Sequence, residues 1–260
     1  MIKLENTEVM GWEAAIRGMR NPMNSWDKSD SHWSHLYDSP KAVMIVDENA
    51  FLLGENDFDL MKRLRNAGTD HRKFMRMITV YVDITAPLYW WKEFDTYKVG
   101  TVANSCSTMH KIADKEFMLD DFSCEHLLDV KDMIPSDQRN ENSIDEDIAL
   151  SAVNVYGNVC YFTPLAFIQM TCNILNRYRD RFIETKDKRY WWQLIQLLPS
   201  SYNQRRTVML NYEVLANIYK SRKNHKLDEW HVFCDWIMGL PYSELITGVF
   251  DELEANKNDV

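Results

Sequence analysis

Residues 79–112 read TVYVDITAPLYWWKEFDTYKVGTVANSCSTMHKI, a β-rich run followed by an aromatic cluster and then by a polar run. The first part predicts a strand that ends near Ala86-Pro87, because β-branched and aromatic residues favour extended backbone. The aromatic cluster predicts a helix from Ala86 towards Lys98, whose apolar side chains anchor the stretch in a core. The polar side chains that follow, up to Thr108, have the chemistry to line a cleft. We therefore expect this stretch to organise both the fold and the site.

The composition describes a globular chain with enough apolar residues for a full core. Its 260 residues are 45% hydrophobic and 27% charged, which suits one large domain or two small ones. Aromatic residues are numerous, and core or subunit contacts are their expected role, with base or cofactor stacking as the alternative. The formal charge of −9 argues against a nucleic-acid partner, because such surfaces cluster Lys and Arg. A small anionic ligand needs only two or three local cations.

Cysteine usage and the first residues predict a cytoplasmic protein without a membrane partner. The five cysteines are odd in number and form no CxxC pair, so we expect neither a disulfide framework nor a zinc ribbon. Free thiols fit a reducing compartment. The opening residues, MIKLENTEVMGW, lack a basic segment followed by an apolar one, so we expect no signal peptide. No apolar run reaches the roughly 18 residues of a transmembrane helix.

Hydrophobic spacing, caps and breakers predict a mainly helical chain. Thr7, Asn56 and Thr163 are the expected N-caps, and Gly68 suits a left-handed position after the second helix. Beside the aromatic helix, helices are expected at Thr7–Arg20, Asn56–Gly68, Thr163–Asp187, Arg189–Leu198, Tyr212–Lys223, Leu227–Met238 and Tyr242–Leu253. Strands are expected at 42–46, 74–85 and 204–211, with a polar loop over residues 23–41. This pattern indicates an α+β fold with helices packed on a mainly antiparallel sheet.

The middle of the chain is strongly acidic and interrupts this pattern. Asp114–Asp147 carries most of the acidic surplus, and the part from Pro135 is expected to be a solvated connection. No firm domain boundary is predicted there, because the C-terminal half has no obvious core of its own.

Sequence motifs for common cofactors are absent, so any ligand must be held by side chains and helix ends. The eight glycines form neither GxGxxG nor a P-loop, and no HxH or HExxH spacing indicates a metal site. Lys98, Arg205, Arg206 and Arg222 adjoin aromatic segments, and an Arg fork suits a phosphate. A surface ion pair is the alternative for each of them. Cys106 has a nucleophile's chemistry, but it has no activating neighbour in sequence, so we expect an inert thiol, with a nucleophile as the alternative.

Three stretches together resemble the flavin-dependent thymidylate synthases. Ala14-Ala-Ile-Arg17 is similar to the family's early Ala- and Arg-bearing helix, and 86–112 is similar, without gaps, to its strand exit, aromatic helix and signature loop. Leu198-Pro199 through Arg222 follows its Leu-Pro, Arg, Asn, Asn, Arg order, also without gaps. The resemblance covers about half the chain. It implies one thymidylate synthase-complementing-protein-like domain over 1–260, with an acidic insertion at about 114–160.

The resemblance also shows where this chain departs from the family. The signature Arg-His-Arg, seven residues, Ser falls on Thr96, Tyr97, Lys98 and Cys106, so only the third position keeps its charge. A Glu-His pair of the family falls on Arg76 and Met77, and a family Arg falls on Glu213. The Gln that precedes the family's signature falls on Glu93. Further along the chain, the family's Arg, Asn, Asn and Arg positions match Arg205, Asn211, Asn217 and Arg222.

Carried over position by position, the resemblance implies a site. Its catalytic residues are Arg222 and Lys98, and its cofactor-binding residues are His71, Tyr97, Lys98, Thr101, Asn211 and Asn217. Its substrate-binding residues are Arg205, Arg222, Cys106, Thr108, Asn104 and Glu93. The implied cofactor is FAD, with NADPH and methylenetetrahydrofolate as co-substrates, in a homotetramer.

The implied activity is methylation of C5 of dUMP or a related pyrimidine nucleotide. The rewritten signature keeps two alternatives open. One is a non-catalytic nucleotide-binding or protein-interaction module that retains the fold. The other is altered pyrimidine C5 chemistry, such as hydroxymethylation in a phage-like setting.

Overall fold

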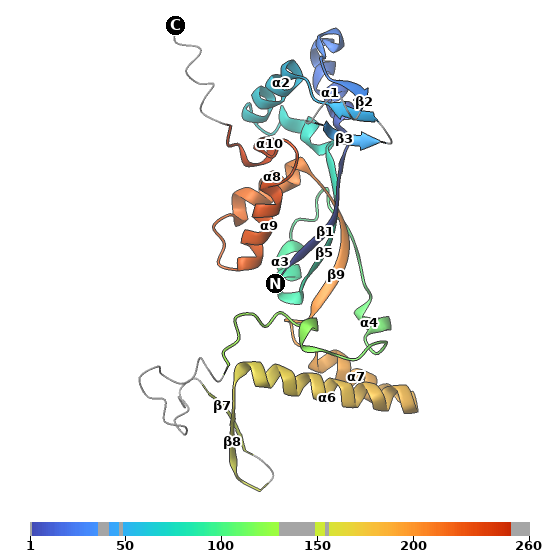
Figure 1. Cartoon of the computed structure of the whole chain (residues 1–260), viewed down its shortest axis with the longest axis vertical. Helices are drawn as coiled ribbons and strands as arrows, with labels where there is room; N and C mark the ends of the chain where they lie inside the picture. Colours follow the sequence, from blue (N-terminus) through green and yellow to red (C-terminus); the bar gives the residue numbers. More distant parts are fainter. Residues whose placement is uncertain (1, 36–41, 47–48, 130–148, 154–155, 251–260) are drawn as a thin grey trace, which may run out of the picture. The chain divides into compact units, whose positions relative to one another are not determined.

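The chain forms two compact units, which are described separately (Figure 1). The computed structural model describes residues 2–35, 42–46, 49–129, 149–153 and 156–250. The first unit, here the sheet unit, comprises Ile2–Thr85, Lys92–Ser105 and the chain from Arg205. The second, here the helical unit, comprises Ala86–Trp91 and Cys106–Gln204.

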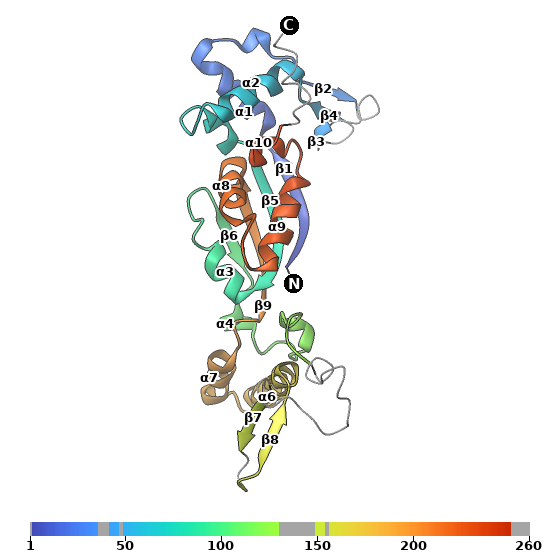
Figure 2. The ribbon, with the colours of Figure 1, turned by 90° about the vertical axis from the view of Figure 1, so that its left-hand side faces the viewer.

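A four-stranded sheet in the order β1-β5-β9-β6 is the centre of the sheet unit. Its strands are β1 (Lys3–Met10), β5 (Thr79–Pro87), β9 (Asn203–Asn211) and β6 (Val102–Ser105). β1 pairs antiparallel with β5, with a bulge between Glu5 and Glu8, and β6 pairs antiparallel with β9. Successive β5 side chains alternate between buried and half-buried, so one sheet face carries the core. Helices α8 (Tyr212–Arg222) and α9 (Asp228–Met238) cover that side (Figure 2).

The predicted first helix is half wrong, because its first residues form the edge strand β1. Gly11, with a φ of 93°, ends that strand and starts α1 (Trp12–Arg20). A Cβ at this glycine would lie 2.1 Å from the Met77 carbonyl oxygen, so no other residue fits this turn without movement. Thr7 therefore lies in a strand and caps no helix, whereas the helical spacing from Trp12 onward predicted α1 correctly.

The second helix, α2 (Glu55–Asn66), takes its cap from a distant loop rather than from Asn56. Asp30 accepts hydrogen bonds from the backbone N–H groups of Asn56 (2.9 Å) and Asp57 (3.1 Å). An acceptor 26 residues away is invisible to a local cap rule. Gly68 does take the expected left-handed conformation, with a φ of 110°.

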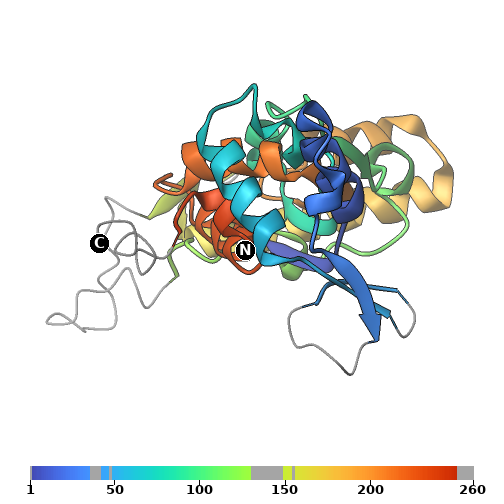
Figure 3. The ribbon, with the colours of Figure 1, turned by 90° about the horizontal axis from the view of Figure 1, so that it is seen from above.

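The loop predicted at 23–41 contains more structure than expected. Two 3-10 turns, η1 (Asn21–Met23) and η2 (Trp26–Lys28), precede a strand, β2 (His32–His35). That strand joins β4 (Asn49–Leu52) and the predicted β3 (Ala42–Val46) in a small antiparallel sheet of order β2-β4-β3, which Figure 3 shows from above. Residues 36–41 of the predicted loop lie outside the described residues.

Two other boundaries differ from prediction. The strand predicted from Phe74 begins only at Thr79, because 72–76 winds into a 3-10 helix, η4 (Arg72–Arg76). The last helix, α10 (Glu244–Thr247), stops at Gly248, where the φ is 77°, instead of running on to Leu253. Residues 251–253 lie outside the described residues.

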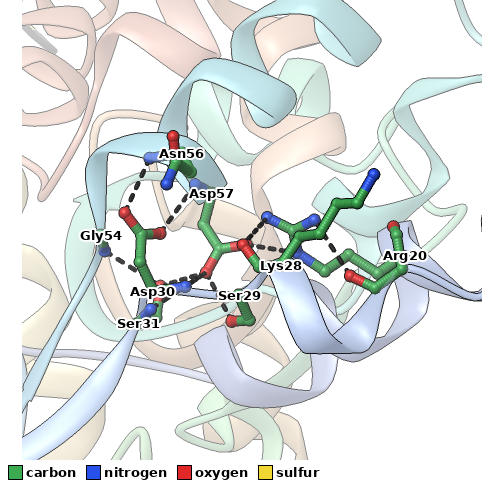
Figure 4. Close-up of polar contacts among 9 residues, drawn as sticks. Arg20, Lys28, Ser29, Asp30, Ser31, Gly54, Asn56 and Asp57 are labelled. Carbon is green, nitrogen blue, oxygen red and sulfur yellow. Dashed lines mark hydrogen bonds and ion pairs between the residues drawn. The ribbon is translucent and has the colours of Figure 1, made fainter.

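A buried ion pair fastens the η1–η2 segment to α2 (Figure 4). Asp57 is fully buried and accepts a hydrogen bond from Arg20 Nε at 2.6 Å and from the hydroxyls of Ser29 and Ser31, each at 2.6 Å. The other guanidinium nitrogens of Arg20 donate to the carbonyls of Ser25 and Lys28. Burial alone would raise the pKa of Asp57, but the hydrogen bonds and the Arg20 charge outweigh it and hold the pKa below its ordinary value.

The helical unit has a hydrophobic core of its own, which the sequence did not predict. α6 (Pro164–Thr185) begins as expected, with the Thr163 hydroxyl accepting from Ala166 N at 3.0 Å. The unit also holds α4 (Thr108–Lys111), η5 (Leu119–Asp121), α7 (Lys188–Leu197) and the hairpin β7–β8 (Leu150–Val153 and Val159–Phe162). Its core is made by Ile112, Phe117, Phe122, Ile168, Cys172, Leu175 and Leu194.

Most of the predicted acidic connection lies outside the described residues, including everything from Pro135 to 148. The described part of the acidic region belongs to the helical unit. A single thymidylate synthase-like domain with an acidic insertion stays a prediction.

Candidate functional site

The end of the aromatic helix α3 (Leu88–Phe94) meets the end of α8 in the sheet unit. Arg222 Nη1 donates to Glu93 Oε2 at 2.7 Å, and Arg222 Nε donates to the Tyr97 hydroxyl at 2.9 Å. Glu93 and Arg222 lie 129 positions apart in the chain. The structure thus brings together three residues that the sequence assigned to one site.

Two further residues from the α9 side complete this group, and the sequence analysis did not select either. Trp230 Nε1 donates to Glu93 Oε2 at 2.8 Å, and the Arg222 guanidinium lies 4.7 Å from the Trp230 ring centre. His225 Nδ1 accepts from Leu227 N, so the neutral ring carries its proton on Nε2, which lies 3.4 Å from Glu93 Oε2. We call Glu93, Tyr97, Arg222, His225 and Trp230 the Glu93–Arg222 cluster.

The cluster is electrically balanced but still has hydrogen-bonding capacity. All three donors to Glu93 converge on Oε2, and Arg222 uses Nε and Nη1. Within the described residues, Glu93 Oε1 and Arg222 Nη2 have no hydrogen-bond partner. The side chains of both residues keep some solvent access, 33% for Glu93 and 17% for Arg222. The cluster therefore keeps one unused acceptor, on Glu93, and one unused donor, on Arg222, a combination that suits a planar amide or imide edge.

Asn211 is the N-cap of α8 and ties a polar turn to it. Its Oδ1 accepts from Val214 N at 3.0 Å, and its Nδ2 donates to the Gly100 carbonyl at 3.4 Å. Gly100 has a φ of 79°, and a Cβ there would lie 2.8 Å from Asn211 Nδ2. The turn that Asn211 fastens carries Lys98, which is exposed, and Thr101.

Thr101 has a buried hydroxyl without a partner in the described part of the chain. A buried polar group without a hydrogen bond costs about 1–3 kcal/mol, so such groups are rare and often belong to binding sites. This observation fits the predicted cofactor role of Thr101.

A second charged group lies at the first turns of α8. The buried Glu213 accepts from Arg72 Nε at 3.4 Å through one oxygen and from Arg76 Nε through the other. Arg72 Nη2 also donates to Asn217 Oδ1 at 3.4 Å. Glu213 raises the pKa of Arg76 through its hydrogen bond and its charge.

These contacts explain one departure from the family pattern. The resemblance places an acidic residue at position 76 and a basic one at position 213, and this chain carries Arg76 and Glu213. The two departures therefore fall on residues that contact each other in this chain. The exchange was visible in the sequence, but only the structure shows that the two positions touch.

The remaining predicted positions of the sheet unit are more exposed. His71 lies in the turn after Gly68 and donates its backbone N–H to the Gly68 carbonyl at 3.1 Å. Asn104 is exposed on β6, paired in register with Thr207.

Arg205 is engaged by carboxylates of the sheet. Its Nη2 donates to Asp83 Oδ2 at 2.8 Å, and Glu5 lies 3.6 Å from its Nη1. Hydrogen bonds from Thr207, Arg205 and Asn6 hold the pKa of Asp83 well below its ordinary value. Arg206 pairs with Asp95 at 2.7 Å.

Cys106 and Thr108 belong to the helical unit. The Cys106 thiol is exposed, and its carbonyl accepts from Gln204 Nε2 at 3.0 Å. Thr108 is the first residue of α4, whose N-cap is Ser107. Their part in one site with the residues of the sheet unit stays a prediction.

A large surface depression of about 1090 Å³ lies elsewhere, beside the Arg20–Asp57 network. It is lined by Arg20 of α1, by residues between Met23 and Asp30, and by residues of α2, and by none of the predicted site residues. Within the described residues, no group of His, Cys, Asp or Glu has the arrangement of a metal site, and no helix is long and apolar enough to cross a membrane.

Comparison with known proteins finds the fold but no sequence relative. No protein-family model matches the chain, and neither does any curated protein sequence. A structure of thymidylate synthase X (ThyX) from Helicobacter pylori with FAD and dUMP has a TM-score of 0.57 at 14% identity, covering 95% of this chain and 98% of that one. A second structure of the Helicobacter pylori flavin-dependent enzyme, complexed with FAD and dUMP, has a TM-score of 0.55 at 13% identity, with the same coverage.

A third similar structure is the UMP/dUMP methylase PolB from Streptomyces cacaoi, bound with 5-Br dUMP. Its TM-score is 0.55 at 13% identity, covering 95% of this chain and 94% of that one. At such identities the likeness establishes the fold alone. It confirms the predicted α+β architecture and the structural resemblance to flavin-dependent thymidylate synthases.

Proposed function

We propose that this chain binds FAD and a pyrimidine nucleotide and modifies C5 of the pyrimidine, with methylation of dUMP as its reaction. The observation that carries the proposal is the direct contact of Glu93, Tyr97 and Arg222, within a fold that resembles enzymes solved with FAD and dUMP. The resemblance independently implies one site for these three residues.

The residues present fit a flavin. Thr101 offers a buried hydroxyl without a partner, and the turn around it is fastened by Asn211. Thr101, Asn211, Asn217, Tyr97, Lys98 and His71 would hold the cofactor. When bound and reduced, a flavin supplies the electrons that methyl transfer from methylenetetrahydrofolate requires, and NADPH is the proposed reductant.

The Glu93–Arg222 cluster would orient the pyrimidine. Arg222 Nη2 would donate to a ring carbonyl, and Glu93 Oε1 would accept from the neighbouring ring N–H. Because Glu93, Tyr97 and Trp230 already fix the guanidinium, its charge is placed in advance where negative charge develops on the carbonyl as C5 reacts. This is the proposed catalytic role of Arg222, with Lys98 as a second cation.

Arg205, Asn104, Cys106 and Thr108 complete the proposed substrate contacts. We also propose the homotetramer that the resemblance implies, in the cytoplasm. Sedimentation of the purified protein tests the tetramer: a monomer at all concentrations would contradict it.

A non-catalytic nucleotide-binding module is the second candidate. Its support is the rewritten signature, in which Thr96, Tyr97 and Cys106 stand at the family's Arg, His and Ser positions.

The visible spectrum of the purified protein, repeated after adding FAD and dUMP, separates the two candidates. The proposed enzyme gives flavin absorbance and releases tritium from dUMP labelled at C5, and mass analysis of the product identifies the added group. We expect Arg222→Gln to abolish release while FAD still binds. A protein that stays colourless with FAD contradicts the proposal, and stabilisation by nucleotides but not by FAD favours the non-catalytic module.

A further inference from the structure

We propose that Arg72 and Arg76, held in place by Glu213, form a subsite for a phosphate or pyrophosphate group of the ligand. The inference rests on the proposed function only in the identity of the ligand that carries this phosphate. Sequence comparison assigned neither arginine to the site.

Glu213 acts as a buried anchor for both side chains. Its two oxygens each accept from the Nε atom of one arginine, so Glu213 occupies none of the outer nitrogens of either guanidinium. Glu213 is only 6% exposed, which fixes the anchor, whereas the Arg76 side chain is 58% exposed. Two Arg forks are thus oriented in advance from a buried base, which lowers the entropy lost when they bind a ligand.

The outer nitrogens keep free donors. Arg72 spends Nη2 on Asn217, while Arg72 Nη1 and both outer nitrogens of Arg76 have no partner within the described residues. Asn217 is exposed and adds an amide N–H₂ group beside them. Paired N–H donors that carry a positive charge bind the oxygens of a phosphate more strongly than the acceptor atoms of a neutral ligand.

The local charge also favours an anion. Arg72 and Arg76 pair with Glu213, the charge of Asp70 acts on Arg76, and the charge of Arg72 acts on Arg65, so three cations neighbour two carboxylates. Burial, and after it the charge of Arg72, lower the pKa of Arg65, whose Nε is committed to the Leu245 carbonyl. A bound anion offsets the repulsion between neighbouring cations, so it lowers the electrostatic free energy of the group.

The position of the pair in the chain connects it to the predicted cofactor residues. Arg72 follows His71 directly and contacts Asn217, and both of these are predicted cofactor-binding residues. The pair therefore places two cations on η4, beside residues to which the resemblance gives the cofactor.

Binding measurements on the full chain test the subsite. The variants are Arg72→Gln and Arg76→Gln, and the control is Lys73→Gln, which removes an equal charge from an exposed residue of the same 3-10 helix. The probes are inorganic pyrophosphate, FAD, riboflavin, dUMP and deoxyuridine, followed by calorimetry and flavin fluorescence. Riboflavin and deoxyuridine carry no phosphate and report any general damage to the site.

We expect each Arg→Gln change to weaken pyrophosphate binding by about tenfold to a hundredfold, as for a lost charge-assisted hydrogen bond. The binding of either FAD or dUMP should weaken by the same factor as the binding of pyrophosphate. The ligand whose binding weakens is the one whose phosphate occupies the subsite. Riboflavin, deoxyuridine and the Lys73→Gln control should stay within about twofold. Each single change leaves the Glu213 carboxylate partly unpaired. The triple variant Arg72→Gln/Arg76→Gln/Glu213→Gln also removes that negative charge. The folded triple variant should show the same loss of pyrophosphate affinity.

Two results would overturn the subsite. One is unchanged binding of pyrophosphate, FAD and dUMP in both Arg→Gln variants, and the other is an equal loss for riboflavin and deoxyuridine. The outcomes separate this inference from the proposed function. Pyrophosphate binding that depends on Arg72 and Arg76, without FAD or dUMP binding, leaves the subsite standing and refutes the function.

Discussion

In the Asp57→Asn variant, we expect the N-terminal part of the sheet unit to unfold at a much lower denaturant concentration than in the unchanged protein. Asp57 is fully buried and accepts five hydrogen bonds, from Arg20 Nε, from the Ser29 and Ser31 hydroxyls, and from the backbone N–H groups of Asp30 and Ser31. An amide has one oxygen, so whichever way it is turned, its N–H₂ group faces a donor. Arg20, itself only 5% exposed, loses its counter-charge.

The magnitude follows from the burial of both partners. Breaking a buried ion pair by removing one charge costs about 3–5 kcal/mol, because the remaining charge stays desolvated. A domain is stable by only about 5–15 kcal/mol, so the variant should lose a large part of its free energy of unfolding. The exposed neighbour Asp59, 61% exposed and paired with Lys62, gives the matched control, and Asp59→Asn should cost less than about 1 kcal/mol.

The assay is urea unfolding at pH 7, followed by tryptophan fluorescence, because Trp12 and Trp230 of the sheet unit are fully buried. The midpoint should shift strongly for Asp57→Asn and little for Asp59→Asn, with unchanged slopes. A loss below about 1 kcal/mol for Asp57→Asn would refute the reasoning, since the pair would then contribute no more than a surface contact.

Two further predictions concern the site. Asn211→Ala should lower the free energy of unfolding by about 0.5–2 kcal/mol, because the cap on Val214 N is lost. It should also weaken FAD binding, because the turn that carries Thr101 is no longer fastened to α8. Equal FAD affinity of the variant and the unchanged protein in a fluorescence titration would argue against this coupling. For Asp83, the folded pKa lies below the ordinary value of 3.8, so its contribution to stability is complete above that pH and is lost as pH falls through and below it. The difference in unfolding midpoint between the protein and Asp83→Asn should therefore shrink between pH 7 and pH 3, and a constant difference would exclude the carboxylate as its cause.

Local sequence patterns predicted the elements whose signals lie within one turn. Thr163-Pro164 started α6 where expected, and the aromatic helix, β3, β9, α7, α8 and α9 lie close to their predicted ranges. These segments succeed because caps, helical spacing and β-branched runs act over a few residues. The errors share the opposite cause: the strand character of Thr7, the cap of α2 and the core of the helical unit depend on partners far away in the chain.

The candidate site divides in the same way. The residue types at the family's positions can be read from the sequence, including the retained Arg205, Asn211, Asn217 and Arg222 and the rewritten signature. The contacts of these residues follow from the tertiary fold. It joined Glu93 to Arg222, added His225 and Trp230, and paired Arg76 with Glu213. The reason is physical: residue identity fixes charge and hydrogen-bonding capacity, whereas distance, burial and partner arise only when segments more than a hundred residues apart pack together.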